Sequence, residues 1–304
     1  MDVLSDVLAR ARAHGAVFSV LGRTAPWGLA FSGTRPLVIH LMLQGSATLV
    51  RGTTAHDVAA GDVILVRGGE PYTLVSAHGV AAEPIEHARA GASYVDGMDV
   101  DAVLLCGAYA LDGEPGPSLL RSLPCELVVK ATDRSSGLCA SVSLMAAEAS
   151  RAAPGQRTVL DRALDLMLVQ VLRDAFAGGH WSAPGWYLAL EDDGLAAVLA
   201  ATHEAPQQRW TVESMASVAH MSRAGFARRF ATTVGQTPAA YLTGLRVERA
   251  AELLQSTGAT VASVANETGF ASEFSLNAAF KRRYGVSPGR WRRGTRRVSE
   301  IKDP

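Results

Sequence analysis

The feature that most constrains this chain is a helix–turn–helix pattern that occurs twice in its last third, about fifty residues apart. In the first copy an apolar-periodic stretch starts at Thr211, and a second helix follows Ser222, a residue type typical of helix N-caps. In the second copy the same roles fall to Thr260 and Ser272. Gly269 lies in the second turn, where a tight connection between crossed helices needs a positive φ. Short capped helices at this spacing predict an all-α domain.

Residues 241–255, between the two copies, have the apolar spacing of one long amphipathic helix. Its apolar side is formed by Leu242, Leu245, Val247, Ala250 and Leu254. A helix of this length would hold the second helices of the two copies at a fixed separation. Two helices held in this way fit successive major grooves on one side of a DNA duplex. The pattern therefore predicts a protein that binds double-stranded DNA.

The formal charge of the whole chain is zero, but it is unevenly distributed. Residues 1–193 hold 14 Lys and Arg against 21 Asp and Glu, a net charge of −7. Residues 194–304 hold 15 Lys and Arg against 8 Asp and Glu, a net charge of +7. This asymmetry indicates that only the last third meets a polyanion, although uneven charge also arises by chance. Charge alone does not identify the polyanion as DNA.

The first half of the chain has a different pattern, with short apolar runs separated by Gly, Pro and Asp. The clearest runs cover residues 36–43, 47–50, 62–66, 72–75 and 100–106. Runs this short, joined by glycine-rich turns, are typical of a β-sandwich or small barrel rather than of βαβ units. From Ser136 onward the apolar period becomes that of two amphipathic helices, interrupted at 153–155.

This helical pair, between Leu138 and Leu172, is more hydrophobic than a lone surface hairpin should be. We therefore expect it to be buried in a homodimer interface. A stretch rich in glycine and proline at 178–185 then resembles a hinge before the basic third.

Within the basic third, the residues at 237–250, 264–270 and 280–288 closely resemble the AraC/XylS family of bacterial transcription regulators. The resemblance covers about 100 residues, from Gly194 to Arg293, and its motifs occur in the family's order. It implies a ligand-responsive DNA-binding regulator, and it favours activation through contact with RNA polymerase.

Several residues of the two recognition helices follow as candidate DNA contacts. In the first helix these are Ser222, Arg223, Ala224 and Arg228. Arg228 corresponds to a family position that reaches bases, and arginine can bond O6 and N7 of guanine together. In the second helix the exposed stripe is expected to be Ser272, Glu273, Ser275, Asn277 and Ala278. Relatives often carry Arg where this chain has Ala278, so the second helix is expected to contact fewer bases.

The basic residues Lys281, Arg282, Arg290, Arg292 and Arg293 are better assigned to phosphates. Such contacts position a protein on the duplex and make binding salt-dependent without specifying sequence. The alternative for each arginine is that it only solvates a helix face.

The segment 61–66 resembles the second motif of cupins, in which a Gly-Asp turn precedes a strand. Arg67 replaces the motif's proline, and Tyr72 replaces its metal-binding histidine. The first cupin motif needs a His-x-His pair, but only His40 is present. A metal site needs three or four converging ligands, so neither a metal nor another cofactor is expected.

The Pro26-Trp27-Gly28 turn, the Cys106-Gly107 pair and the segment 118–124 resemble the cupin-like sensor domain that precedes this type of DNA-binding unit, over roughly residues 2–180. The resemblance implies a small-molecule effector inside the barrel and dimerisation through the helices that follow it. The candidate pocket residues are Trp27, His40, Met42, Tyr72 and Tyr109. Val38, His40 and Met42 share one strand face by parity. A hydrogen-bonded core histidine at 40 and a packing tryptophan at 27 remain open alternatives.

The three cysteines, Cys106, Cys125 and Cys139, are too few for a disulfide framework. Two of them could form a reversible redox disulfide, although buried free cysteine is most often inert. No apolar run reaches the length of a membrane span, and the acidic N-terminus lacks the features of a signal peptide. A soluble, cytoplasmic protein is expected.

The expected fold class is α+β: a cupin-like β-barrel, a helical hairpin and an all-α domain with two helix–turn–helix units. The expected boundaries are 1–130 for the sensor, 131–180 for the dimerisation hairpin, 181–193 for a linker, 194–293 for the DNA-binding domain and 294–304 for a tail. The expected function is a sequence-specific, effector-responsive transcription regulator without catalytic residues. The alternatives are a cupin-type isomerase or oxygenase, which lacks its metal ligands, and an architectural DNA-binding protein.

Overall fold

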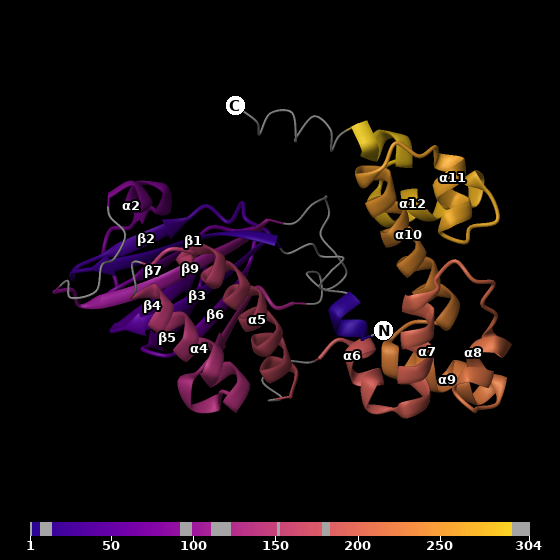
Figure 1. Ribbon diagram of the computed structural model, residues 1–304, viewed down its shortest axis with the longest axis horizontal. Helices are drawn as coiled ribbons and strands as arrows, with labels where there is room; N and C mark the ends of the chain where they lie inside the picture. The colour runs from indigo at the N-terminus through magenta and orange to yellow at the C-terminus, as the bar shows by residue number, and fades with distance from the viewer. Residues whose placement is uncertain are drawn as a thin grey trace. The chain divides into compact units, whose positions relative to one another are not determined.

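The computed structural model describes six stretches of the chain, in two compact units. The described residues are 2–6, 14–91, 99–110, 123–150, 153–177 and 183–293. The first unit holds the β-strands and the helices up to residue 177; the second holds the described N-terminal residues and the helices from residue 183 onward (Figure 1). Residues 118–122 of the sensor motif, 178–182 of the predicted hinge and the tail 294–304 lie outside the described residues.

The first unit is built from two five-stranded sheets (Figure 1). One has the strand order β1–β9–β3–β6–β10, over His14–Arg23, Ala102–Ala110, Leu37–Gln44, Val63–Arg67 and Glu126–Val129. The other has the order β5–β4–β7–β2–β8, over Thr54–Ala59, Ser46–Arg51, Tyr72–Val75, Gly28–Phe31 and Glu83–Pro84. Helix α2, Ile85–Gly91, follows β8. Every apolar run predicted as a strand lies on one, which confirms the sheet-rich first domain.

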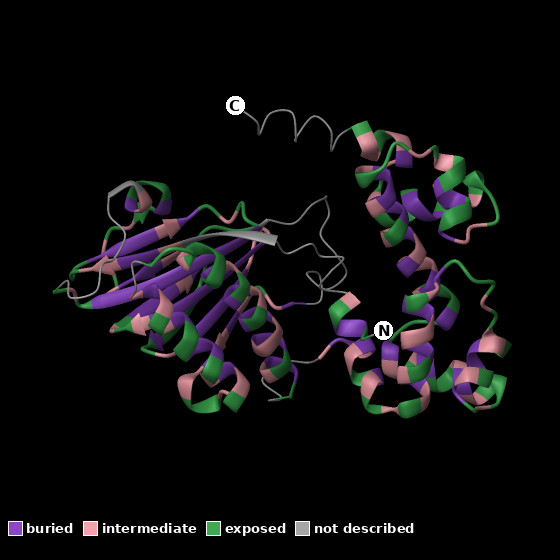
Figure 2. Cartoon of the chain, in the orientation of Figure 1, coloured by how far each residue is buried: buried purple, intermediate pink, exposed green. Residues whose placement is uncertain are grey.

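The core of this unit follows from strand alternation, since every second side chain of a strand points to the same face. Met42 of β3, Ile64 of β6 and Leu104 of β9 belong to one buried cluster with Leu29 and Leu74 of the opposite sheet. In Figure 2 the strands of this unit are coloured largely as buried. The two sheets are therefore held together by a continuous apolar interior.

The predicted helical hairpin consists of α4 (Ser136–Ala149) and α5 (Gln156–Ala177). The Leu164 side chain of α5 packs so closely on Gly107 of β9 that an added Cβ there would come within 2.9 Å of it. The Tyr109 hydroxyl donates a hydrogen bond to the Leu164 carbonyl at 2.7 Å. The apolar side of α5 is therefore covered by α4 and by the sheet that contains β1, β9 and β10, which accounts for much of the hydrophobicity that suggested a dimer interface.

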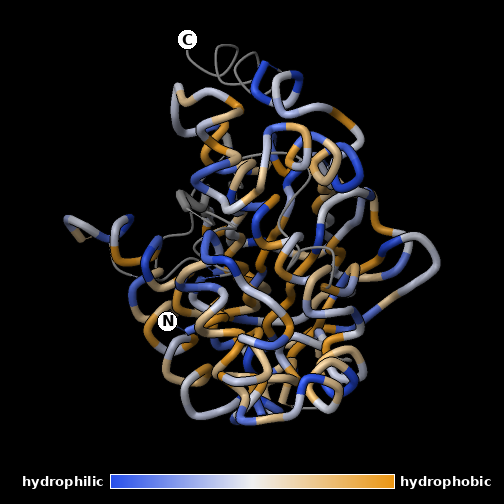
Figure 3. The backbone as a smooth tube through the Cα atoms, turned by 90° about the vertical axis from the view of Figure 1, so that its right-hand side faces the viewer, coloured by the Kyte–Doolittle hydropathy of each residue, from blue (hydrophilic) through white to orange (hydrophobic). Residues whose placement is uncertain are grey.

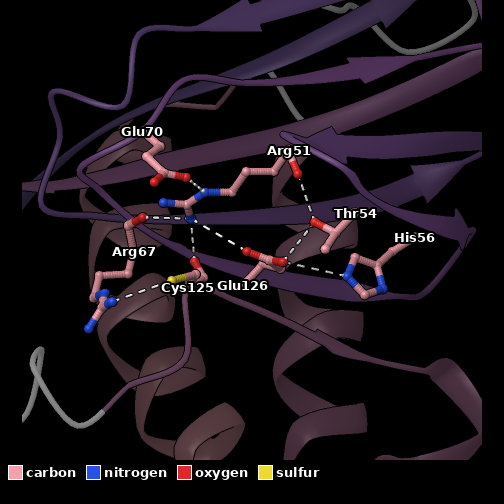
Figure 4. A network of polar contacts seen from close by, with 7 residues as sticks. All are labelled: Arg51, Thr54, His56, Arg67, Glu70, Cys125 and Glu126. Carbon is pink, nitrogen blue, oxygen red and sulfur yellow. Dashed lines mark hydrogen bonds and ion pairs between the residues drawn. The ribbon is translucent and has the colours of Figure 1, made fainter.

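A polar network around Arg51 connects β4 to the start of β10 (Figure 4). The buried Arg51 guanidinium donates from Nη1 to the carbonyls of Arg67 and Cys125, at 3.0 and 2.6 Å. It also forms ion pairs with Glu70 and Glu126, each at 3.6 Å. These contacts offset part of the desolvation cost of the buried cation, and they join β4 to β6 and to the start of β10.

The second unit is helical. Its elements are α6 (Gly185–Leu188), the 3-10 turn η2 (Ala189–Glu191), α7 (Asp193–Glu204), α8 (Val212–Val218), α9 (Arg223–Val234), α10 (Pro238–Ser256), α11 (Val261–Glu267) and α12 (Glu273–Tyr284). Both predicted helix–turn–helix units are confirmed, as α8–α9 and α11–α12. The long helix between them, α10, begins earlier than the predicted residue 241, because Thr237 caps it and Pro238 occupies its first turn.

Two boundaries differ from the expected ones. Residues 185–191, expected in a linker, form α6 and η2, and the buried Trp186 holds this segment in the helical unit. Residues 2–6, expected in the sensor domain, also belong to the helical unit. There the Asp6 carboxylate lies 2.5 Å from His203 Nδ1, and His203 Nε2 hydrogen-bonds the Tyr241 hydroxyl at 2.7 Å. No helix among the described residues is long and apolar enough to cross a membrane.

Candidate functional site

The first recognition helix is α9, and its two faces differ sharply. The Ser222 hydroxyl accepts a hydrogen bond from the Gly225 N–H and caps the helix as predicted. Phe226 and Phe230 are buried, so they fix the inner face. Arg228 lies on the exposed face.

Two other arginines of α9 have partners within the unit. Arg223 forms an ion pair with Glu213 of α8 at 2.8 Å, and Arg229 pairs with Asp192, the N-cap of α7. Ala224, beside Arg223, is exposed. An open hollow of about 520 Å³ follows α9, and its lining includes Ser222, Gly225, Arg228, Arg229 and Thr232. A concave, partly cationic surface of this kind suits a phosphate backbone or base edges.

The second recognition helix is α12, and a capping box closes its N-terminus. The Ser272 hydroxyl accepts from the Ser275 N–H at 3.2 Å, and the Ser275 hydroxyl accepts from the Ser272 N–H at 3.1 Å. Ser275 is therefore engaged in the cap rather than free on the surface. Glu273 and Ala278 are exposed and Asn277 is half-buried, while Leu276 and Phe280 are buried.

The predicted phosphate contacts lie at the C-terminal end of the unit, where the last described residues are strongly hydrophilic (Figure 3). Lys281, Arg282 and Arg290 are exposed. Arg292 is half-buried and donates a hydrogen bond to the Ala259 carbonyl, so it joins two segments of the unit. A neighbouring arginine of α12, Arg283, pairs with Glu248 of α10 at 2.7 Å.

One exposed residue of α12 was missed by the sequence analysis. The Phe274 side chain is 83% exposed, the highest value for a large hydrophobic residue among those described. A signal was available, because Phe274 precedes the exposed Ala278 by four residues and so shares its helix face.

The barrel interior brings together four of the five predicted pocket residues. Trp27, Met42 and Tyr72 belong to the same buried cluster, which Cys106 joins. His40 is buried beside them, with Nε2 2.9 Å from the Tyr72 hydroxyl and Nδ1 3.1 Å from the Cys106 sulfur. Tyr109 is the exception: its hydroxyl binds α5 on the outer face of the sheet, so the expectation that it lines the interior is wrong.

Burial keeps this polar cluster uncharged. It lowers the pKa of His40 to about 3, with a smaller contribution from the Arg89 guanidinium. It raises the pKa of the Cys106 thiol to about 12 and that of Tyr72 well above its ordinary value. The neutral imidazole is held between a hydroxyl and a thiol, and the Tyr72 hydroxyl keeps a further hydrogen-bonding site that carries no fixed charge.

The same geometry does not fit a cupin metal centre, because both ring nitrogens of His40 are engaged with Tyr72 and Cys106. Among the residues that the structure describes, no three His, Cys, Asp or Glu side chains come together around a position for a metal ion. Cys106, Cys125 and Cys139 are free thiols, and Cys125 is exposed beside the Arg67 guanidinium, 3.4 Å away.

Comparison with known proteins identifies both domains. A sequence model described as cupin matches residues 2–177, and one described as a helix-turn-helix domain matches residues 215–294. The regulator AlkR of Acinetobacter baylyi is 29% identical over 308 residues, which cover 96% of this chain and 99% of AlkR. A Streptomyces lividans protein described as an AraC-like transcription regulator is 31% identical over 301 residues, covering 96% of this chain and 98% of that protein.

A third relative, the transcriptional activator RclR of Escherichia coli K12, is 29% identical over 306 residues, covering 98% of this chain and all of RclR. These relatives are transcription regulators, and the match covers nearly their full length. This supports a DNA-binding regulator over the cupin-enzyme alternative. With a cupin domain ahead of two helix–turn–helix units, this chain belongs to the AraC family of transcription regulators.

Proposed function

We propose that the chain recognises one specific DNA sequence through two successive major grooves, with α9 and α12 as the recognition helices, and that it acts by binding without catalysing a reaction. The observation that carries this proposal is the pair of capped helices, each with a buried aromatic face and an exposed outer face. The 19 residues of α10 between them span about 28 Å at 1.5 Å per residue, close to one turn of the duplex.

Within this proposal, Arg228 supplies the main base contact of α9, to O6 and N7 of a guanine. Ser222, Arg223 and Ala224 border that contact at the start of the helix. On α12 the corresponding surface is formed by Ser272, Glu273, Ser275, Asn277 and Ala278. Lys281, Arg282 and Arg290 bind phosphates, which makes binding weaker as salt rises.

The effector is a small molecule bound in the barrel interior beside Trp27, His40, Met42 and Tyr72. The buried Tyr72 hydroxyl supports this assignment, because it bonds His40 and keeps a further hydrogen-bonding site in an apolar core. Effector binding shifts the population between arrangements that bind the operator and arrangements that do not. Screening small molecules for an effect on operator affinity, with Tyr72→Phe as the comparison variant, identifies the effector class.

The family resemblance also implies a homodimer and activation through RNA polymerase. The residues that support a dimer are Leu144 of α4 and Val159 and Leu166 of α5, which are more than a third exposed. Val159 and Leu166 are seven residues apart and share one helix face. Light scattering of Leu166→Glu against the unmodified protein tests the dimer, and transcription with purified RNA polymerase tests activation.

The experiment that tests the DNA proposal is a footprint on DNA upstream of the protein's own and neighbouring genes, with unrelated DNA as competitor. We expect protection of two adjacent major grooves per subunit, about 34 Å apart, that survives the competitor. Diffuse protection that the competitor abolishes equally would show a nonspecific DNA-binding protein and contradict the proposal. The protected sequence also defines the operator for every experiment below.

A further inference from the structure

The exposed aromatic ring of Phe274 is placed where a recognition helix meets bases. Phe274 is the second residue of the 12-residue helix α12, and its side chain is 83% exposed. The other exposed large hydrophobic residues of the described chain reach at most 46%. The N-terminal residues of a recognition helix are those that reach base edges in the major groove. The most exposed apolar side chain therefore lies on the turn that contacts DNA.

Helix geometry places Phe274 on a stripe with Ala278 and Lys281, since residues four and seven positions apart share one face. All three are exposed. The stripe is thus aromatic, then small and apolar, then cationic. Ala278 leaves room beside the ring, and Lys281 lies one turn further along, where a phosphate contact is expected.

The neighbouring contacts prevent the ring from turning inward. Leu276 and Phe280 are fully buried on the opposite side of α12, so the helix cannot rotate about its axis without exposing them. The capping box between Ser272 and Ser275 fixes the backbone on both sides of Phe274. The ring is accordingly presented to the outside by a rigid helix turn.

The equivalent positions of α9 carry the opposite chemistry. Aligning the caps Ser222 and Ser272 pairs Ala224 with Phe274 and Arg228 with Ala278. The first helix therefore has a small residue at the earlier position and a guanidinium at the later one. The second helix has an aromatic ring at the earlier position and a small residue at the later one. A guanidinium suits guanine O6 and N7, whereas a phenyl ring suits the C5-methyl group of thymine in the major groove.

We infer that Phe274 contacts the C5-methyl group of a thymine in the second half of the operator and so determines the specificity of α12. This inference rests on the proposed function, because it needs α12 in a major groove. It also assigns a role to a helix that lacks an arginine at position 278. Apolar contact replaces hydrogen bonding as the source of sequence preference in the second unit.

The test compares thymine with deoxyuridine, which lacks only the methyl group. Each thymine in the α12 half of the operator is replaced singly, and the affinity of the full-length protein is measured. Removing one buried methyl group is expected to weaken binding about four-fold at a single position. Phe274→Ala is expected to bind the thymine and deoxyuridine operators equally, and Phe274→Leu to keep part of the preference.

Leu188→Ala provides a matched control, because Leu188 is an exposed hydrophobic residue of the same unit outside both recognition helices. It should keep the full preference for thymine. The inference is overturned if Phe274→Ala retains that preference, or if no deoxyuridine replacement weakens the unmodified protein. It is also overturned if Phe274→Ala lowers transcription but not operator affinity, since Phe274 would then contact a protein partner. If the unmodified protein gave no specific footprint, that result would instead refute the proposed function itself.

Discussion

The two helix–turn–helix units share a backbone plan but differ on the surfaces offered to DNA. Both second helices have 12 residues, begin after a capping serine and bury a phenylalanine eight residues after it, Phe230 or Phe280. Their outer faces share no residue at the positions compared above, where Ala224 and Arg228 correspond to Phe274 and Ala278. Caps and core thus determine the framework, while the outer face is free to set which bases are contacted.

The largest effect should come from the shared core. Replacing Phe230 or Phe280 by Ala removes a fully buried ring, which typically costs about 3–5 kcal/mol of unfolding free energy. Because both rings are equally buried, the two losses should be similar. Urea unfolding of the two variants measures them. A loss below about 1 kcal/mol for one variant alone would show that the units do not share an equivalent core.

Substitutions in the turns of the two units should differ more in their effect on stability than substitutions in the two cores. Gly269 has φ of 79°, as predicted, and an added Cβ would lie 2.7 Å from the Gln207 carbonyl oxygen. In the first unit the left-handed position is taken by the exposed His220, with φ of 53°. Gly269→Ala should therefore destabilise by about 2 kcal/mol or more, since strain and a backbone clash add.

His220→Gly relieves the strain of a left-handed non-glycine residue, partly offset by the entropy of glycine. We expect a gain of about 0.5 kcal/mol. Thermal unfolding of the two variants beside the unmodified protein measures both changes. If Gly269→Ala left the unfolding free energy unchanged, the close approach of Gln207 to the second turn would not matter for stability.

The next prediction concerns the outer faces. Arg228→Ala should cost about 1–3 kcal/mol of operator affinity and relax the preference for one guanine, because a bidentate base contact is lost. The slope of affinity against salt should stay nearly unchanged. A uniform loss on all sequences with a shallower salt slope would identify Arg228 as a phosphate contact instead.

Ala278→Arg restores in the second unit the arginine that the first unit has at the aligned position. It should add a preference for guanine only where the operator offers one, and leave the slope of affinity against salt nearly unchanged. Fluorescence anisotropy with labelled operator variants measures both arginine substitutions. Together they test whether the two faces use different chemistry on one framework.

The sequence predicted most of this framework because its signals are local. Ser222, Ser272 and Gly269 are turn and cap residues whose roles follow from backbone geometry, and each behaves as expected. The edge strand β5 was missed because only Val58 in it is buried, so it lacks an alternating pattern. The predicted linker was wrong at 185–191, because α6 in this segment packs against α9, an element remote in the sequence.

The positions of the candidate site residues could be predicted only where the pattern of a single strand or helix shows which face is buried. Parity correctly grouped His40 with Met42, and the contact with Tyr72 followed because the interior is shared by both sheets. Tyr109 was misplaced because both faces of β9 are apolar, so the pattern does not say which one meets α5. Phe274 was missed because an aromatic residue in a helix is normally read as core.

The caps are expected to have small and local effects, which separate the two units from each other. Ser222→Ala and Ser272→Ala should each cost about 1 kcal/mol, because each leaves a helix N–H without its acceptor. Ser275→Ala should add a smaller loss in the second unit, since its hydroxyl accepts the Ser272 N–H; Gly225 has no side chain to do the same in the first. Hydrogen exchange of the first turns of α9 and α12 measures each loss separately, because exchange reports local opening. Faster exchange confined to the helix whose cap is removed is the expected result, whereas equal acceleration in both helices would mean that the two units open together and that neither cap acts locally.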